Sequence, residues 1–229
     1  MKLHGLQKMT LLDFPEHVAC TVFLGGCDFR CPFCHNFELA DGSAKAVMTD
    51  DDFFKFLSGR KGLLDGVAIT GGEPCMHKEL PAFLAKIKEL GFAVKLDTNG
   101  YHPETLENIL ENELCDYVAM DIKNSPAKYA ETCGIKEIDI SVIKKSIGLV
   151  MKKAKDYEFR TTVVKEFHSE EDFEEIGKMI KGGGRYFLQA FTDRDTVPFG
   201  NLHAPSRDEL EKYAAIARKY VSKAEVRGV

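Results

Sequence analysis

Three cysteines stand close together near the N-terminus, in a spacing that can hold an iron–sulfur cluster. Cys27, Cys31 and Cys34 form a C-x3-C-x2-C pattern directly after an apolar run over residues 18–24. Three thiolates on one short loop can bind three corners of a cubic iron–sulfur cluster. With no fourth cysteine in the pattern, one iron stays open to a ligand that is not protein, as in catalytic metal sites. The pattern therefore predicts a 4Fe–4S cluster that takes part in chemistry.

Zinc is the alternative metal for the same loop, with His35 as its fourth ligand. His35 directly follows Cys34, whereas the ligands of a tetrahedral zinc site are usually separated by two or more residues. A third interpretation treats the cysteines as chance core residues, but Pro32 and the two glycines before Cys27 favour an exposed loop. The other four cysteines have no ligand-like spacing: Cys20, Cys75, Cys115 and Cys133.

A second polar motif, Gly71-Gly72-Glu73, follows the next expected strand. Two glycines allow the backbone to approach a ligand closely, and a carboxylate can accept hydrogen bonds from an ammonium group. An ordinary turn is the alternative for this motif taken alone. Its position after a strand, behind the cysteine loop, makes the two motifs together a stronger signal for a ligand site.

Charged residues end or interrupt three further expected strands. Asp97-Thr98-Asn99-Gly100 fits a simple turn as well as a ligand site, because Asx-Gly sequences are common in turns. Asp121-Ile122-Lys123 predicts either a solvated ion pair of little energetic value or a pair that meets a ligand. Arg160 lies inside an apolar strand and must find a partner or reach solvent.

The elements that must position these residues alternate between strands and helices. Apolar and β-branched runs predict six strands, over residues 19–24, 67–70, 92–96, 117–120, 159–164 and 186–191. Helical periodicity and capping residues predict helices over residues 49–59, 78–90, 103–114, 141–155, 169–180 and 206–221.

This alternation predicts an α/β fold with a parallel sheet and right-handed crossovers. Six units fit a partial (β/α)6 TIM-like barrel better than a closed barrel of eight units, which needs roughly 250 residues. A doubly wound open sheet is the alternative. No linker or repeat divides residues 1–229, so we expect a single domain, with its site at the C-terminal ends of the strands.

Composition excludes some partners. The formal net charge is -5, so no excess of positive charge predicts nucleic acid or an anionic membrane as a partner. The first apolar run is too short to span a membrane, and no N-terminal signal pattern precedes it. Seven cysteines are an odd number, and they fit metal ligands and core residues of a reduced, cytoplasmic protein.

The three-cysteine loop, with Phe33 before its last cysteine, resembles the radical S-adenosylmethionine superfamily. Three stretches are similar to the activating enzymes of glycyl radical enzymes, in particular those of anaerobic ribonucleoside-triphosphate reductases: Leu11-Leu12-Asp13-Phe14-Pro15, Val22-Phe23-Leu24-Gly25-Gly26-Cys27 and Cys34-His35-Asn36. The similarity runs over essentially the whole chain and implies one radical S-adenosylmethionine domain. Phe191 departs from the pyruvate formate-lyase activating enzymes, which have a histidine at that position.

The resemblance implies roles for the residues above. Cys27, Cys31 and Cys34 would hold the cluster. The residues implied in binding S-adenosylmethionine are Phe33, Asn36, Gly71, Gly72, Glu73, Asp97, Thr98, Asp121 and Lys123. Relatives use the matching Asp97 and Thr98 near the methionine carboxylate, in some cases around a monovalent cation. Lys123 would meet that carboxylate, and Asp13 and Arg160 would position an incoming protein loop.

The resemblance also implies an activity. A reduced cluster would cleave S-adenosylmethionine, and the resulting radical would remove a hydrogen from a glycine α-carbon of a partner glycyl radical enzyme. A flavodoxin or ferredoxin would supply the electron under anaerobic conditions. Two alternatives remain, namely a radical enzyme with a small-molecule substrate and a zinc-binding module without catalytic activity. The histidines His102, His168 and His203 are expected at the surface or in helix caps.

Overall fold

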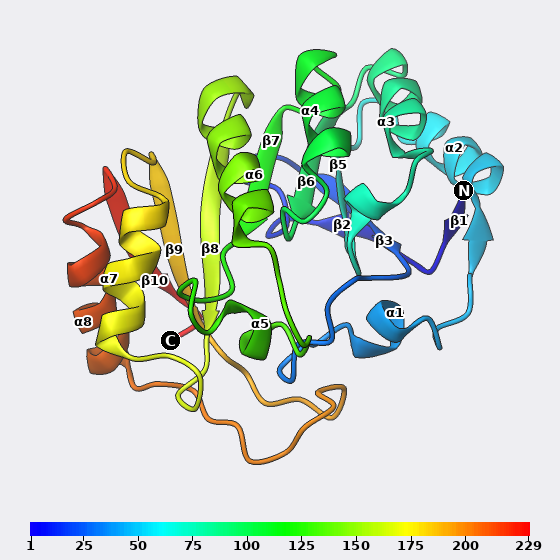
Figure 1. Cartoon of the computed structure of the whole chain (residues 1–229). Coiled ribbons are helices and arrows are strands. Elements are labelled where there is room, and N and C mark those ends of the chain that lie inside the picture. The colour runs from blue at the N-terminus through cyan, green and yellow to red at the C-terminus, as the bar shows by residue number, and fades with distance from the viewer.

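The six strands expected from the sequence all form, and they lie side by side in chain order. The computed structural model describes the whole chain, residues 1–229. One eight-stranded sheet has the order β10-β9-β8-β7-β6-β5-β3-β2, and Figure 1 shows helices ranged along one of its faces. The expected strands are β3 (Ala19–Leu24), β5 (Gly66–Gly71), β6 (Ala93–Thr98), β7 (Tyr117–Asp121), β8 (Tyr157–Val163) and β9 (Arg185–Ala190).

All neighbours from β3 to β10 pair in parallel. The six expected helices also form, as α2 (Asp50–Ser58), α3 (Leu80–Glu89), α4 (Pro103–Glu111), α6 (Ile140–Lys153), α7 (Glu170–Met179) and α8 (Arg207–Ala217). The end strands β2 and β10 do not pair with each other, so the barrel is partial. The expectation of a partial, TIM-like α/β architecture is confirmed.

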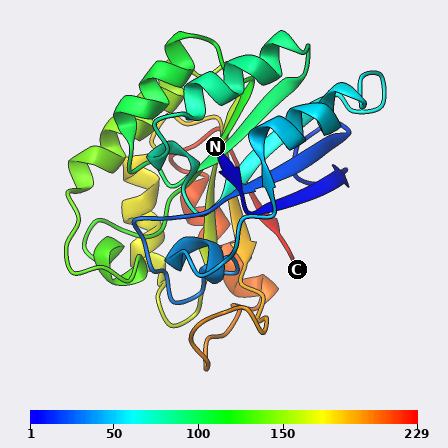
Figure 2. The same cartoon turned by 90° about the vertical axis from the view of Figure 1, so that its right-hand side faces the viewer.

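Two strands of the sheet and several short elements were not predicted. Strand β10 (Lys223–Arg227) extends the parallel sheet beyond β9, and β2 (Gly5–Thr10) pairs antiparallel with β3. Figure 2 shows the free edge of β2 at the right of that view. The short elements are β1 (Lys2–Leu3), β4 (Met48–Thr49), α1 (Phe37–Asp41), a 3-10 turn (Pro74–Met76) and α5 (Tyr129–Thr132).

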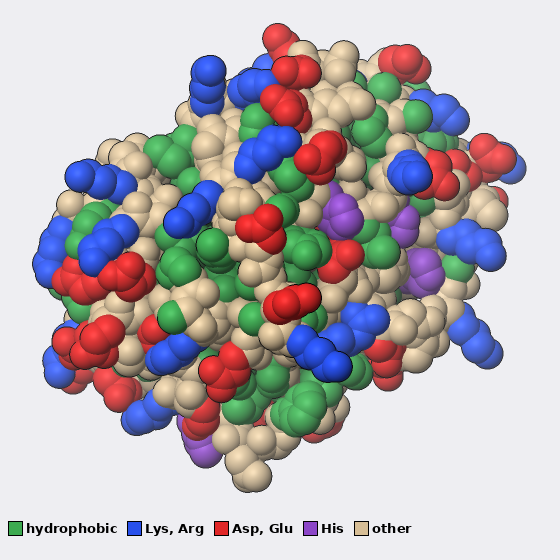
Figure 3. All heavy atoms as spheres, viewed as in Figure 1, with side chains coloured by type: hydrophobic (Ala, Val, Ile, Leu, Met, Phe, Trp, Pro, Cys, Tyr) green, Lys and Arg blue, Asp and Glu red, His purple; other side chains and the backbone are tan.

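The outer face of the sheet is apolar, whereas the inner face carries charged residues beside a small apolar cluster of Phe14, Ala19, Tyr117 and Ala119. On β6, Val94 and Leu96 are fully buried in the main hydrophobic core together with apolar residues of the helices. Because side chains alternate along a strand, Lys95 and Asp97 project to the opposite, inner side. The outer surface of the helices carries interspersed charges of both signs, as Figure 3 shows. Charged side chains inside the sheet therefore face the inner side, where the site lies.

The C-terminal ends of the strands gather at one end of the molecule. The cysteine loop, α1, α5 and the loop between β9 and α8 all lie there (Figure 1). Helix α2 begins behind a capping box formed by Thr49 and Asp52. No helix combines the length and the apolar character needed to cross a membrane.

Candidate active site

One cavity of about 230 Å³ opens at the C-terminal ends of the strands. With one exception, it is lined by all the residues that the sequence singled out. These are Cys27, Cys31, Phe33, Cys34, Asn36, Gly71, Gly72, Glu73, Asp97, Thr98, Asp121, Lys123 and Arg160. The exception is Asp13, whose carboxylate accepts a hydrogen bond of 2.6 Å from the Thr21 hydroxyl on β3.

The cysteine loop is held in place by contacts from distant parts of the chain. Its entry is fixed at Gly26, whose carbonyl accepts from the Glu73 N–H at 2.8 Å and whose N–H donates to the Leu39 carbonyl at 2.7 Å. Its middle is fixed at Arg30, whose N–H donates to the Cys133 carbonyl at 2.8 Å, and the Phe29 ring is buried beneath it. A tight turn joins the last two cysteines, with the Cys34 N–H 3.1 Å from the Cys31 carbonyl.

The three thiols of this loop share the cavity wall but differ in environment. Burial raises the pKa of Cys27 to about 12 and also raises the pKa of Cys34. Cys31 has a lowered pKa because Cys133 donates a hydrogen bond to its sulfur and the Lys123 ammonium group lies nearby, which together outweigh burial. A cation beside three thiols favours their ionised, metal-binding forms. The donor set therefore fits a metal–sulfur cluster.

No group of three His, Cys, Asp or Glu side chains lies close enough to hold a single metal ion. A cubic cluster has a different requirement, because each cysteine binds a separate iron atom. His35, the proposed fourth zinc ligand, places its Nε2 2.6 Å from the Thr192 carbonyl and stacks on Phe191. That nitrogen must be protonated to donate to a carbonyl, so it is not free to bind zinc.

The Gly71-Gly72-Glu73 turn packs directly on the strand that leads to the cysteines. A Cβ atom on Gly72 would lie 2.0 Å from the Gly26 carbonyl oxygen, and Gly71 has a φ of +120°. Close backbone contact thus requires glycine at both positions, and the left-handed conformation is a second requirement at Gly71. The sequence predicts that these glycines let the backbone approach a ligand. The structure shows that they also let the turn pack closely on the segment that leads to the cysteines.

The buried carboxylate of Glu73 joins three segments. It accepts hydrogen bonds from Cys75 N–H at 2.9 Å, from Thr98 Oγ1 at 2.7 Å and from Asn99 N–H at 2.6 Å. Burial raises its pKa, and these three bonds act against that rise. A carboxylate can accept about four hydrogen bonds, so about one site is left for a further donor.

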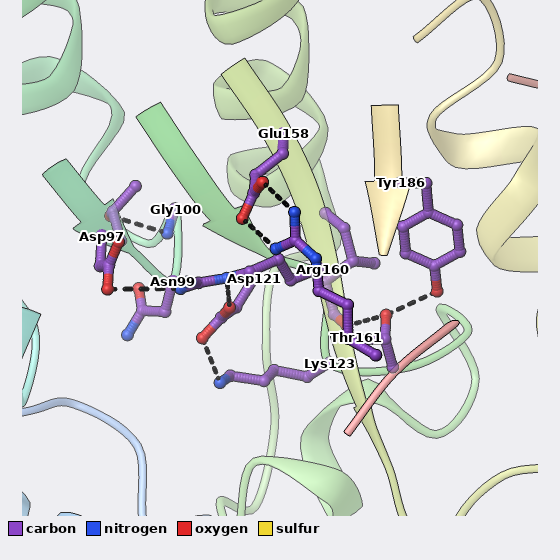
Figure 4. A network of polar contacts seen from close by, with 12 residues as sticks. Asp97, Asn99, Gly100, Asp121, Lys123, Glu158, Arg160, Thr161 and Tyr186 are labelled. Atoms are coloured by element: carbon purple, nitrogen blue, oxygen red, sulfur yellow. Dashed lines mark hydrogen bonds and ion pairs between the residues drawn. The ribbon is translucent and has the colours of Figure 1, made fainter. Parts of the chain in front are cut away.

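A half-buried ion network lies across β6, β7 and β8, and Figure 4 shows it at close range. The carboxylate of Asp121 accepts from Lys123 Nζ at 3.0 Å and from Arg160 Nε at 3.0 Å. Asp97 lies 3.6 Å from an Arg160 nitrogen and also pairs with Lys95. Asp121 and Lys123 therefore form a half-buried pair, and Arg160 finds its partners within the site.

Opposite charges control ionisation in this network. Burial alone would raise the pKa of Asp121, but the charges of Lys123 and Arg160 outweigh it and lower that pKa to about 2. The pKa of Asp97 is lowered in the same way, because Arg160 and Lys95 outweigh burial. Three cations thus face two carboxylates, and the remaining positive charge favours an anionic ligand group.

Several residues near the site have roles that the sequence does not indicate. Lys95 falls within an expected apolar strand, although its position two residues before Asp97 places both on one face. The sequence indicates Asn99 only as part of a turn motif, and it indicates no role for Cys133. His168 is expected at the surface or in a cap, but it is buried, with Nε2 2.9 Å from the Lys123 carbonyl. That expectation was wrong because its partner lies 45 residues away.

A family model and individual known proteins that match this chain point to the same family. Residues 21–180 match the model of the Radical SAM superfamily. A protein of Methanocaldococcus jannaschii, provisionally named as a glycyl-radical enzyme activating enzyme, is 35% identical over 98% of this chain and 95% of its own length. The pyruvate formate-lyase-activating enzyme of Clostridium pasteurianum is 32% identical over 54% of this chain and 52% of its own.

Solved structures show the same fold. A domain of the pyruvate-formate lyase-activating enzyme from Bacteroides vulgatus superposes with a TM-score of 0.58 and 20% sequence identity. The superposition covers 71% of this chain and 99% of that domain.

Proposed function

This chain belongs to the radical S-adenosylmethionine superfamily, and we propose that it installs a glycyl radical on an anaerobic ribonucleotide reductase. It is a radical S-adenosylmethionine enzyme related to glycyl-radical enzyme activating enzymes, and that family implies a 4Fe–4S cluster and S-adenosylmethionine. The observation that carries the proposal is the cavity, where three thiols meet the glycine turn and the charged strand ends. We propose that residues 1–229 form one functional domain around it.

Each part of the cavity has a proposed task. Cys27, Cys31 and Cys34 would hold the cluster, which when reduced would supply the one electron that cleaves S-adenosylmethionine to methionine and a 5′-deoxyadenosyl radical. The free acceptor site of Glu73 and the backbone at Gly71 and Gly72 bind the amino group of S-adenosylmethionine.

The remaining contacts to the cosubstrate come from both sides of the cavity. Lys123 binds the carboxylate of S-adenosylmethionine, because its ammonium group carries part of the excess positive charge. Asp121 holds Lys123 in place. Asp97 and Thr98 contribute at the same end, around a monovalent cation. Phe33 and Asn36 complete the pocket, and the Asn36 side chain is fixed by a 3.2 Å bond to the Gly71 carbonyl.

The protein substrate enters as an extended loop. A glycine suits this reaction, since its α-carbon carries no side chain to block the approach of the radical. The α-carbon gives up one hydrogen atom, which leaves a glycyl radical and 5′-deoxyadenosine. We propose that Asp13 and Arg160 position the loop, and that a flavodoxin or ferredoxin reduces the cluster. The similarity of the N-terminal stretches to activating proteins of anaerobic ribonucleotide reductases supports this choice of partner.

Electron paramagnetic resonance tests the proposal. The anaerobically purified, reduced protein is mixed with S-adenosylmethionine and the anaerobic ribonucleotide reductase of the same genome. We expect a glycyl doublet with the wild type, and none with Cys31→Ala. Cys115→Ala is the matched control, since Cys115 is also buried but lies away from the cavity. It should keep the doublet.

Other outcomes would favour the alternatives. Cleavage of S-adenosylmethionine without a doublet on any glycyl radical enzyme of that genome would favour a small-molecule substrate. Cleavage that survives Cys31→Ala would contradict the cluster assignment. Zinc instead of iron and acid-labile sulfide in the purified wild type would favour the zinc-binding module.

A further inference from the structure

The side chain of Asn99 reaches the cysteine loop from the end of β6. Its Nδ2 lies 3.7 Å from the sulfur of Cys27, within the range of an N–H···S hydrogen bond. Asn99 is buried, with 6% of its surface exposed. It lines the cavity, and Figure 4 shows it among the strand-end residues Asp97 and Asp121. The contact joins the third strand-end motif to a residue that we assign as a cluster ligand.

A neighbouring contact fixes which end of the Asn99 side-chain amide faces the sulfur. The N–H of Tyr101 donates to Asn99 Oδ1 at 2.8 Å, so the amide oxygen is engaged on that side. A flipped amide would bring two donors together at Tyr101 and turn an acceptor toward the sulfur. In addition, the backbone N–H of Asn99 donates to Glu73 at 2.6 Å, which holds the residue on the glycine turn. The NH2 group therefore points at Cys27.

Hydrogen bonds to the sulfur ligands of an iron–sulfur cluster change its reduction potential. Reduction adds negative charge, and a donor beside a sulfur stabilises that charge, so the donor raises the potential. Cys27 receives one such bond from within its own loop, from Phe29 N–H at 3.4 Å. Asn99 supplies a second one, from a side chain outside the loop, which can therefore be replaced without changing the loop.

We propose that Asn99 is a positioning residue that hydrogen-bonds the Cys27 ligand and raises the reduction potential of the cluster. This inference rests on the proposed cluster at Cys27, Cys31 and Cys34. A higher potential makes the cluster easier to reduce by its electron donor. Asn99 also couples the cluster to Glu73, because one residue contacts both.

The test is a redox titration of the full-length, cluster-loaded protein, followed by electron paramagnetic resonance of the reduced cluster. In Asn99→Ser, a hydroxyl can still accept from Tyr101 N–H but is too short to reach Cys27. In Asn99→Asp, the turn is kept and an acceptor replaces the donor. Asn112→Ser is the control, because Asn112 is exposed and its amide bonds only to Asn108.

We expect a more negative midpoint potential in Asn99→Ser, a larger negative shift in Asn99→Asp, and the wild-type potential in Asn112→Ser. Iron content measured beside each titration identifies variants that hold a full cluster. A wild-type potential in either fully loaded Asn99 variant would overturn the inference. If Asn99→Ser binds too little iron to be titrated, a wild-type potential in fully loaded Asn99→Asp would still overturn the inference. A wild type without a 4Fe–4S signal would instead overturn the proposed function.

Discussion

Gly72 lies where the glycine turn crosses the backbone that leads to the cysteines. A Cβ atom there would meet the Gly26 carbonyl oxygen at 2.0 Å and its carbon at 2.7 Å. Both are backbone atoms, so no side chain can rotate away. We predict that Gly72→Ala lowers the free energy of unfolding by about 2 kcal/mol, the usual scale for an overpacked site. Urea unfolding under anaerobic conditions measures it.

Gly148 provides the matched control for that substitution. It lies within α6 and a Cβ atom there would meet nothing within 4 Å. Alanine is the better helix former, so Gly148→Ala should be neutral or stabilising by up to about 1 kcal/mol. Equal unfolding free energies for the two variants would show that the turn accommodates a Cβ atom at Gly72 without loss of stability.

At the residue scale, the sequence predicts those groups whose spacing alone indicates their chemistry. The three cysteines and the strand-end acids belong to this class, and they line one cavity. The sequence does not predict the roles of Asn99 and Lys95 in the site, nor the contact of Cys133 with Cys31. Each of these residues acts through a partner that its local pattern does not indicate. Asn99 and Cys27 are 72 residues apart, so no local pattern relates them.

At the element scale, β10 contributes a partner to a buried charge. Arg227 on β10 places both terminal nitrogens 3.1 Å from the oxygens of Glu158 on β8, and its guanidinium lies over the Phe187 ring. Glu158 is 1% exposed and its only other side-chain partner is Tyr117, at 2.7 Å. We predict that Arg227→Ala lowers the free energy of unfolding by about 2 kcal/mol, because a buried carboxylate loses its charged partner.

Thermal and urea unfolding would measure this loss against a control on the same strand. Lys223 pairs only with the exposed Glu225, so Lys223→Ala should change stability by less than about 0.5 kcal/mol. Adding Glu158→Gln to the Arg227 variant should recover part of the loss, since the unpaired charge is then removed. Similar losses in Arg227→Ala and Lys223→Ala would mean that β10 does not stabilise the sheet through this pair.

The same strand shows why element prediction was incomplete. The six predicted strands are apolar because helices cover their outer face. β10 reads Lys-Ala-Glu-Val-Arg and β2 reads Gly-Leu-Gln-Lys-Met-Thr, both at the ends of the sheet. Edge strands have fewer buried positions, so their sequences lack the apolar run that predicts a strand. Their pairing is decided by the neighbouring strand.

At the scale of the whole molecule, the apolar core extends far beyond the candidate site, and of its residues only Phe29, Cys31 and Phe33 also line the cavity. The core fills the space between the sheet and its helices, whereas the ionisable groups project from the inner face and the strand ends. The cysteine loop is joined to this frame by hydrogen bonds at Gly26, Arg30 and Cys27. The frame thus positions the loop without depending on a metal.

Because most of the core lies outside the site, we predict that the protein keeps its fold when the cluster is removed by chelation. Small metal-binding domains unfold without their metal, because the metal holds them together in place of a hydrophobic core. This chain has a hydrophobic core of its own, in which 46 buried residues form one cluster. We expect the cluster-free protein to keep its far-ultraviolet circular dichroism and the slow amide exchange of β5, β6 and β7. Its melting temperature should fall, since bound cluster stabilises only the folded state. Faster exchange should be confined to residues 25–36. Loss of protection throughout β6 would contradict this and make the cluster part of the folding core.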